Sequence, residues 1–145
     1  IKLLKLFFFI ILLQIIIGAF VSGLDAGLVY QTWPKMNSTF FPDDINLEKF
    51  NFFVYLNDQS FVQFLHRNLA YLILALSIFI GFDLYLNKKK EGIKIFLIVV
   101  LVLVAQICLG IFTLISGLNL TLASLHQITS VLLVFSVLYL NHKFS

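Results

Sequence analysis

Residues 62–67 (VQFLHR) come directly before a long apolar run, residues 69–82, and include His66. Sixty residues later the chain repeats this pattern, where residues 123–127 (ASLHQ) place His126 before a second apolar run. In both stretches the histidine follows a leucine, precedes a polar residue and has a small residue four positions further on. The two histidines therefore hold equivalent places in two similar segments of the chain.

The composition is that of a membrane protein. Of the 145 residues, 61% are hydrophobic and only 12% are charged, whereas soluble domains carry about 25% charged residues. Four apolar runs have the length of about 20 residues that a membrane-spanning helix needs, and none contains a proline. The short alternating segments typical of β-barrel strands are missing. We therefore predict an all-α integral membrane protein with spans at about 3–21, 64–86, 93–115 and 122–140.

Basic residues are distributed unevenly between the two sides of these spans. If the chain starts inside, seven basic residues lie on the inner side and three on the outer side. Positive charge favours the cytoplasmic side, so we expect both termini there, in a bacterial cell membrane or facing the matrix of a mitochondrion. The loop 22–61 then lies outside, either as a lid or as an inert connector. The inner residues are Lys2, Lys5, Lys88, Lys89, Lys90, Lys94 and Lys143, and the outer ones are Lys35, Lys49 and Arg67.

An internal repeat relates the first span to the third. Residues 14–20 (QIIIGAF) and 106–112 (QICLGIF) share Gln, Gly and Phe at the same spacing. Since these two spans run in the same direction, we predict a four-transmembrane-helix bundle of two repeated helix pairs, related by an axis along the membrane normal. This symmetry places His66 and His126 at the same depth on facing helices, where bundles build cofactor sites.

The repeated glutamine and glycine share one helix face. Gln14 and Gly18 are four residues apart, as are Gln106 and Gly110. A glycine lets a ring or a neighbouring backbone approach closely, and a glutamine within the membrane needs a polar partner. We expect both pairs to serve helix packing, and contact with a cofactor is the alternative.

Two histidines at equivalent positions indicate one shared ligand. Imidazole binds Fe, Cu, Zn and Ni, but zinc and copper sites usually need further protein ligands, and the single Cys108 provides no cysteine-based site. A haem iron needs only two axial ligands, so we predict that His66 and His126 are the metal ligands of a haem suited to electron transfer. Arg67 could pair with a haem propionate or only extend to the interface. We expect His142, in the basic tail, to be solvated.

Four stretches of the chain carry a family resemblance. They are residues 18–36 (GAFVSGLDAGLVYQTWPKM), 62–67, 106–110 (QICLG) and 125–127 (LHQ). Together they are similar to the C-terminal half of haem A synthase, in the form found in α-proteobacteria and mitochondria. The match runs over nearly the whole chain, and the pieces GLDAG and TWP are its most specific parts.

The resemblance implies an eight-helix enzyme of two similar four-helix bundles. In that family the N-terminal bundle binds the substrate, haem O, and carries a catalytic glutamate near its histidine ligands. The C-terminal bundle holds a haem b cofactor between two histidines, which correspond here to His66 and His126. The enzyme oxidises the C8 methyl group of haem O to a formyl group, giving haem A for cytochrome c oxidase.

The sequence departs from the complete enzyme, since we expect residues 1–145 to lack the N-terminal bundle. No glutamate stands within a turn of His66 or His126, so a carboxylate for general acid–base chemistry is absent and we name no catalytic residue. We expect residues 1–145 to form the haem b-binding half of an oxidoreductase, inactive alone. Its partners would be the lipid bilayer and the missing bundle or a second subunit, with no nucleic acid. The alternatives are a stand-alone b-type cytochrome and a structural or assembly subunit without haem.

Overall fold

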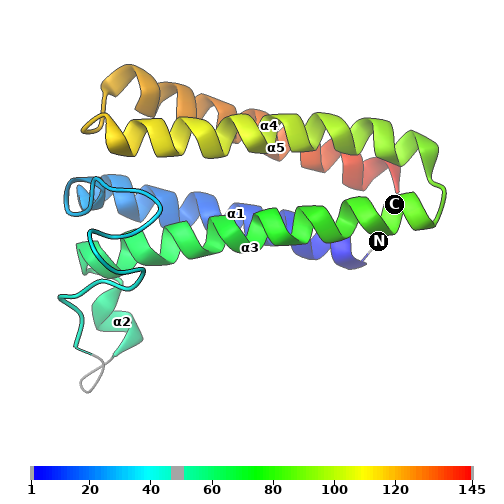
Figure 1. Ribbon diagram of the computed structural model, residues 1–145. Coiled ribbons are helices and arrows are strands. Elements are labelled where there is room, and N and C mark those ends of the chain that lie inside the picture. The colour runs from blue at the N-terminus through cyan, green and yellow to red at the C-terminus, as the bar shows by residue number, and fades with distance from the viewer. Residues whose placement is uncertain (1, 47–50, 145) are drawn as a thin grey trace.

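Four long helices make up most of the molecule (Figure 1). The computed structural model describes residues 2–46 and 51–144, so the predicted outer residue Lys49 lies outside the described residues. Each of the four helices is long and apolar enough to cross a membrane, which confirms the predicted all-α membrane fold. The elements in chain order are α1 (Lys2–Gly23), η1 (Ala26–Leu28), α2 (Phe52–Tyr55), α3 (Gln59–Leu86), α4 (Lys90–Ile115) and α5 (Leu120–Lys143).

The long helices extend beyond the predicted spans because capping residues set their ends. Helix α3 begins at Gln59, where the side chain of Asp58 accepts a hydrogen bond from the backbone N–H of Phe61 at 2.8 Å. The side chain of Asn119 caps α5 in the same way. Hydropathy marks the part of a helix that lies in lipid, whereas a cap satisfies the free N–H groups of its first turn. As a result, His66 and His126 lie about two turns inside their helices.

The helices form a ring of antiparallel neighbours. Helix α1 packs mainly on α3, and α4 packs mainly on α5; contacts of α3 with α4 and of α1 with α5 close the ring. Figure 1 shows these as two layers, with α1 and α3 below α4 and α5. The helices that carry the two histidines, α3 and α5, are therefore diagonal to each other, as the repeat predicts.

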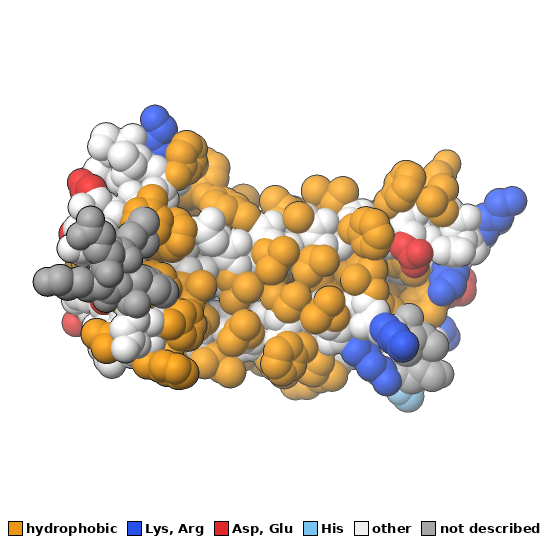
Figure 2. All heavy atoms as spheres, turned by 90° about the horizontal axis from the view of Figure 1, so that it is seen from below, with side chains coloured by type: hydrophobic (Ala, Val, Ile, Leu, Met, Phe, Trp, Pro, Cys, Tyr) orange, Lys and Arg blue, Asp and Glu red, His pale blue; other side chains and the backbone are white. Residues whose placement is uncertain are grey.

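Apolar side chains from all four long helices meet along the bundle axis. The central ones have almost no exposed surface, and they include Phe7, Ile11, Ile80, Val99, Val137 and Leu140. Large apolar side chains also cover the outside, where Ile78 is 68% exposed and Leu101 is 70% exposed. Because lipid tails are as apolar as these side chains, outward-facing leucine and isoleucine have no cost in a bilayer. Figure 2 shows this hydrophobic belt, with charged side chains gathered at the two ends of the molecule.

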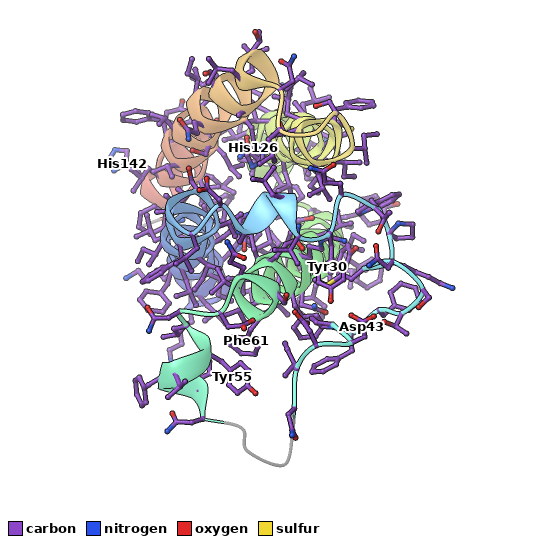
Figure 3. The ribbon with its side chains drawn as sticks, turned by 90° about the vertical axis from the view of Figure 1, so that its left-hand side faces the viewer. Tyr30, Asp43, Tyr55, Phe61, His126 and His142 are labelled. Atoms are coloured by element: carbon purple, nitrogen blue, oxygen red, sulfur yellow. The ribbon has the colours of Figure 1, made fainter. Side chains whose placement is uncertain are left out.

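The loop after α1 folds back over one end of the bundle. The short helix η1 contacts both α1 and α3, and Gly27 lies against the side chain of Leu118 in the turn between α4 and α5. The amide of Gln59 donates to the backbone oxygen of Leu24 at 2.6 Å. Viewed end-on, η1 crosses the middle of the bundle (Figure 3). This end of the bundle is the one that carries the histidines.

Candidate cofactor site

His66 lies against the glutamine and the glycine of the first helix. The side-chain nitrogen of Gln14 is 3.4 Å from Nε2 of His66 and donates to the His66 backbone oxygen at 3.1 Å. Gly18 faces the same ring, and a Cβ atom placed on it would lie 3.1 Å from Cε1. A side chain at position 18 would therefore crowd the imidazole.

His126 has the same surroundings in the second helix pair. The side-chain nitrogen of Gln106 is 3.4 Å from Nε2 of His126, and a Cβ atom on Gly110 would lie 2.9 Å from Cε1. In addition, Nδ1 of His126 donates to the backbone oxygen of Gln106 at 3.0 Å. A carbonyl can only accept, so the proton of the neutral ring resides on Nδ1, and Nε2 carries the lone pair that faces the Gln106 amide.

The repeat found in the sequence is thus a repeat of side-chain contacts. Both glutamines and both glycines pack helix against helix, as expected, and the group they pack against is an imidazole. The helices that carry the two rings, α3 and α5, lie diagonally in the same four-helix ring. Figure 3 shows His126 towards the middle of the bundle, whereas His142 points outward and is exposed.

Several buried polar atoms near the histidines have no hydrogen-bond partner among residues 2–46 and 51–144. They are Oε1 of Gln14, Gln63 and Gln106, Nδ1 of His66 and Nε of Arg67. Buried polar groups are nearly always paired in folded proteins, and unpaired ones concentrate where a ligand, ion or water completes the structure. The orphaned atoms therefore indicate a site around the two histidines.

The donor set of this site fits a haem iron. Among residues 2–46 and 51–144, no three or more His, Cys, Asp or Glu side chains lie together where they could hold a metal ion. Two neutral imidazoles suit an iron whose other positions are filled by a macrocycle. Gly18 and Gly110 let the rings approach their neighbouring helices closely, and the surrounding helices are apolar. When bound, a haem would supply a one-electron redox centre.

Arg67, the third predicted site residue, holds the outer loop. Its Nη1 donates to the backbone oxygens of Thr32 and Lys35 at 2.9 and 3.3 Å, and its Nη2 donates to that of Tyr30 at 2.8 Å. The Nε atom is buried and has no hydrogen-bond partner in the part of the chain that the structure describes. Three of the five guanidinium N–H groups are thus occupied by the loop. Arg67 also lines a pocket of about 280 Å³ with Phe64, Asn68 and Tyr71, and neither histidine lines it.

A polar cluster in the outer loop was not predicted from the sequence. The hydroxyl of Tyr30 donates to Asp43 at 2.6 Å and to Asp44 at 3.1 Å, and Ser60 donates to Asp44 at 2.5 Å. Gln63, one turn before His66, donates to the backbone oxygen of Tyr30 at 2.9 Å. Burial, followed by these hydrogen bonds, raises the pKa of Tyr30 above its ordinary value. A lone tyrosine in a polar loop gives no sequence signal for such a cluster.

The comparisons with known proteins identify the family of the chain. Residues 1–138 match the COX15-CtaA family, described as cytochrome oxidase assembly protein. The chain belongs to this family. Within the COX15-CtaA family it resembles proteins named heme A synthase, and no solved structure matches the chain.

Three of these relatives show the extent of the similarity. The heme A synthase of Pelagibacter ubique is 45% identical over 135 residues, which cover 91% of this chain and 40% of the relative. That of Flavobacterium psychrophilum is 38% identical over 142 residues, with 94% and 41% covered. That of Rickettsia prowazekii is 35% identical over 130 residues, with 90% and 39% covered. The chain thus spans about 40% of the length of the curated relatives it matches.

Proposed function

We propose that this chain is the haem b-binding half of a haem A synthase, with His66 and His126 as the two axial ligands of the iron. The observation that carries the proposal is the repeated arrangement around the two rings. Each imidazole lies between a glutamine amide at 3.4 Å and a glycine. Helix packing alone does not require the same three residue types around both histidines.

The residues of the chain would position the two histidines. The contacts of Gln14 and Gln106 hold each ring against its neighbouring helix. The apolar core lies on one side of this region, and η1 contacts α1 and α3 at the end of the bundle. Arg67 would serve chiefly to fasten the loop, and its unpaired Nε–H could pair with a propionate. A carboxylate is absent within one turn of either histidine, so the chain provides no acid–base group at the ligands.

In the whole enzyme, this half would receive or deliver electrons during the oxidation of haem O to haem A. The oxidation itself would take place in the remaining part of the protein, since the chain covers about 40% of its relatives. We therefore expect the isolated chain to bind haem b and to leave haem O unchanged. Conversion of haem O by the purified chain alone would overturn this division of roles.

A stand-alone b-type cytochrome is the second candidate function. The observation that favours it is that both proposed ligands lie in this one bundle, on the diagonal helices α3 and α5. Electron transfer through a bis-histidine haem needs no further protein ligand. The sequence of the native gene upstream of this chain separates the two functions, since a second four-helix bundle preceding it supports the synthase.

The decisive test is the reduced-minus-oxidised absorption spectrum of the detergent-purified chain supplied with haem. We expect a low-spin haem b spectrum in the wild type and its loss in both His66→Ala and His126→Ala. His142→Ala is the matched control, because this exposed side chain lies in the last turn of α5, far from His126 in its first turns. A folded wild-type chain without a haem spectrum would refute the proposal and favour a structural or assembly role.

A further inference from the structure

A pocket between the outer loop and α3 has no part in the site around the histidines. One wall is formed by loop residues between Pro34 and Phe41, and the other by α3 residues between Phe64 and Tyr71. Its volume is about 280 Å³, whereas small-molecule sites typically enclose roughly 300–1,000 Å³. The pocket therefore has room for the ring of a ligand but not for a whole lipid molecule.

The walls of the pocket are mainly aromatic. The rings of Phe41 and Phe64 meet edge to face at a centroid separation of 5.1 Å and join the loop to the helix. Met36 is fully buried, whereas Phe40 is 65% exposed, so the pocket has a closed interior and an exposed rim. Aromatic rings and a thioether make favourable contacts with a flat apolar ring.

Two polar side chains of α3 also line the pocket. Asn68 and Tyr71 are three residues apart, which places them on the same helix face. Asn68 donates one N–H to the backbone oxygen of Phe64 at 2.8 Å. Its second N–H, its Oδ1 and the hydroxyl of Tyr71 have no hydrogen-bond partner among the residues that the structure describes. The pocket thus offers both donors and an acceptor to the oxygen atoms of a ligand.

Hydrogen bonds hold the loop wall against the helix. The guanidinium of Arg67 donates to three backbone oxygens between Tyr30 and Lys35. Within the loop, the backbone N–H of Met36 donates to the backbone oxygen of Thr39 at 2.7 Å. A wall that is ordered in advance loses less conformational freedom when a ligand binds.

The cations next to the pocket are already engaged. Most N–H groups of Arg67 are occupied by the loop, and its Nε is buried. The ammonium of Lys35 lies 5.8 Å from the centre of the Phe40 ring, in a cation–π contact. Phosphate is recognised by charge-assisted hydrogen bonds from free cations. The lining therefore favours a neutral ligand over a phosphate group.

The pocket and His66 lie on opposite faces of α3. Since an α-helix turns by about 100° per residue, the lining residues between Phe64 and Tyr71 are rotated by about 100–200° from His66. A ligand in the pocket is thus separated from the imidazole by about one helix diameter, roughly 10 Å.

We infer that this pocket binds the ring of a membrane-soluble quinone, whose apolar tail extends into the bilayer. A quinone is flat and neutral, and its two carbonyl oxygens accept hydrogen bonds. Binding itself does not depend on haem, whereas the role of the quinone as electron acceptor rests on the proposed function. In that role it would take up two electrons, each from one oxidation of ferrous to ferric iron, and two protons from water at the exposed rim, and leave as the quinol.

The first test is a fluorescence titration of the purified chain in phosphatidylcholine nanodiscs. The probe is a benzoquinone with a ten-carbon tail, and the signal is the quenching of Trp33, the single tryptophan, which adjoins Pro34 of the pocket. We expect saturable quenching in the wild type. In Asn68→Leu the dissociation constant should rise about 3- to 10-fold, the effect of one lost hydrogen bond, and Tyr71→Phe should also weaken binding.

Two controls accompany the titration. Gln127→Leu changes an exposed polar side chain of α5 and should leave the dissociation constant unchanged. Decylbenzene, which has the ring and the tail but no oxygen atoms, should not displace the quinone. Circular dichroism reports whether each variant folds.

Three results would overturn the inference. The first is quenching that rises without saturation in the wild type, which indicates only partition into the bilayer. The second is an equal dissociation constant in the wild type, Asn68→Leu and Tyr71→Phe. The third is loss of binding when phosphatidylglycerol replaces phosphatidylcholine, which would assign the pocket to an anionic lipid headgroup.

A second experiment tests the role in electron transfer. The quinone is added without oxygen to the reduced, haem-loaded chain, and oxidation is followed by absorbance. We expect two haems to be oxidised per quinone, more slowly in Asn68→Leu than in the wild type, and equal rates would refute this role. A chain that binds the quinone but shows no haem spectrum refutes the proposed function and leaves the pocket assigned.

Discussion

The side-chain nitrogen of Gln106 lies 3.4 Å from Nε2 of His126, and the equivalent pair, Gln14 and His66, has the same separation. In both pairs the two residues belong to neighbouring antiparallel helices. An imidazole nitrogen that accepts from an amide is unprotonated, so the ring is neutral. The contact therefore holds both rings in equivalent positions, and a metal at Nε2 would replace the amide there.

The glycines beside the rings are expected to be intolerant of substitution. In Gly110→Ala, the new Cβ would meet Cε1 of His126 at 2.9 Å, and overpacking of this kind typically costs about 1–3 kcal/mol. We expect a displaced ring and a clear loss of the low-spin haem signal in the absorption spectrum. Gly18→Ala, with a distance of 3.1 Å, is expected to show a smaller loss. The matched control is Gly23→Ala, where a Cβ meets nothing within 4 Å.

Arg67 is expected to control the opening of the outer loop. Arg67→Gln removes hydrogen bonds to the backbone oxygens of Tyr30, Thr32 and Lys35, and loss of a charged donor costs roughly 2 kcal/mol. Trypsin cleavage after the exposed Lys35 should therefore become about 30-fold faster, since 1.4 kcal/mol corresponds to a factor of ten. The rate is measured by gel or mass spectrometry.

The control for this experiment is Lys94→Gln. Lys94 pairs with Glu91 at 3.8 Å, and both side chains are about three-quarters exposed, at 76% and 75%, so its loss should leave cleavage after Lys35 unchanged. Unchanged cleavage in Arg67→Gln together with a loss of haem would instead assign Arg67 to the propionate.

The polar cluster in the outer loop, formed by Tyr30, Asp43, Asp44 and Ser60, should lose its hydrogen bonds at high pH. The pKa of Tyr30 in the folded protein is raised above the value of about 10 for an unfolded tyrosine. Its contribution to stability is therefore complete below about pH 10 and declines as the pH rises towards the folded-state pKa. Trp33, the single tryptophan, lies in this loop, and its fluorescence reports the release.

Tyr30→Phe provides the comparison. The variant loses the hydrogen bonds to Asp43 and Asp44, which should destabilise the folded loop by about 1–3 kcal/mol at neutral pH. Above about pH 10, its Trp33 fluorescence should change less than that of the wild type. Tyr85→Phe is the control, because Tyr85 is 69% exposed and lies at the other end of α3. A high-pH change of equal size in Tyr30→Phe and in the wild type would exclude Tyr30 as its cause.

The orientation in the membrane can be tested by labelling with an impermeant maleimide. The distribution of lysines predicts that Lys89 faces the cytoplasm and that Ser38 faces outward. In a Cys108→Ala background, Ser38→Cys should be labelled on intact spheroplasts, and Lys89→Cys only after lysis. The opposite pattern would invert the predicted topology.

The sequence by itself determined the fold class and the equivalence of the two histidines. Hydropathy predicts spanning helices directly, because a bilayer leaves the backbone few other ways to satisfy its polar groups. The spacing shared by residues 14–20 and 106–112 then relates the helix pairs without further information. The helix ends were predicted less well, since caps such as Asp58 lie outside the apolar run.

Only the tertiary structure decided the polar contacts around these elements. It brought Tyr30, Asp43 and Ser60 together and directed Arg67 to the carbonyls of the loop. It also placed each histidine ring against a glutamine of the neighbouring helix. Such contacts depend on how the helices and the loop pack in three dimensions, which the apolar pattern of the sequence does not specify. The sequence therefore predicts which residues recur, and the tertiary structure decides what each of them contacts.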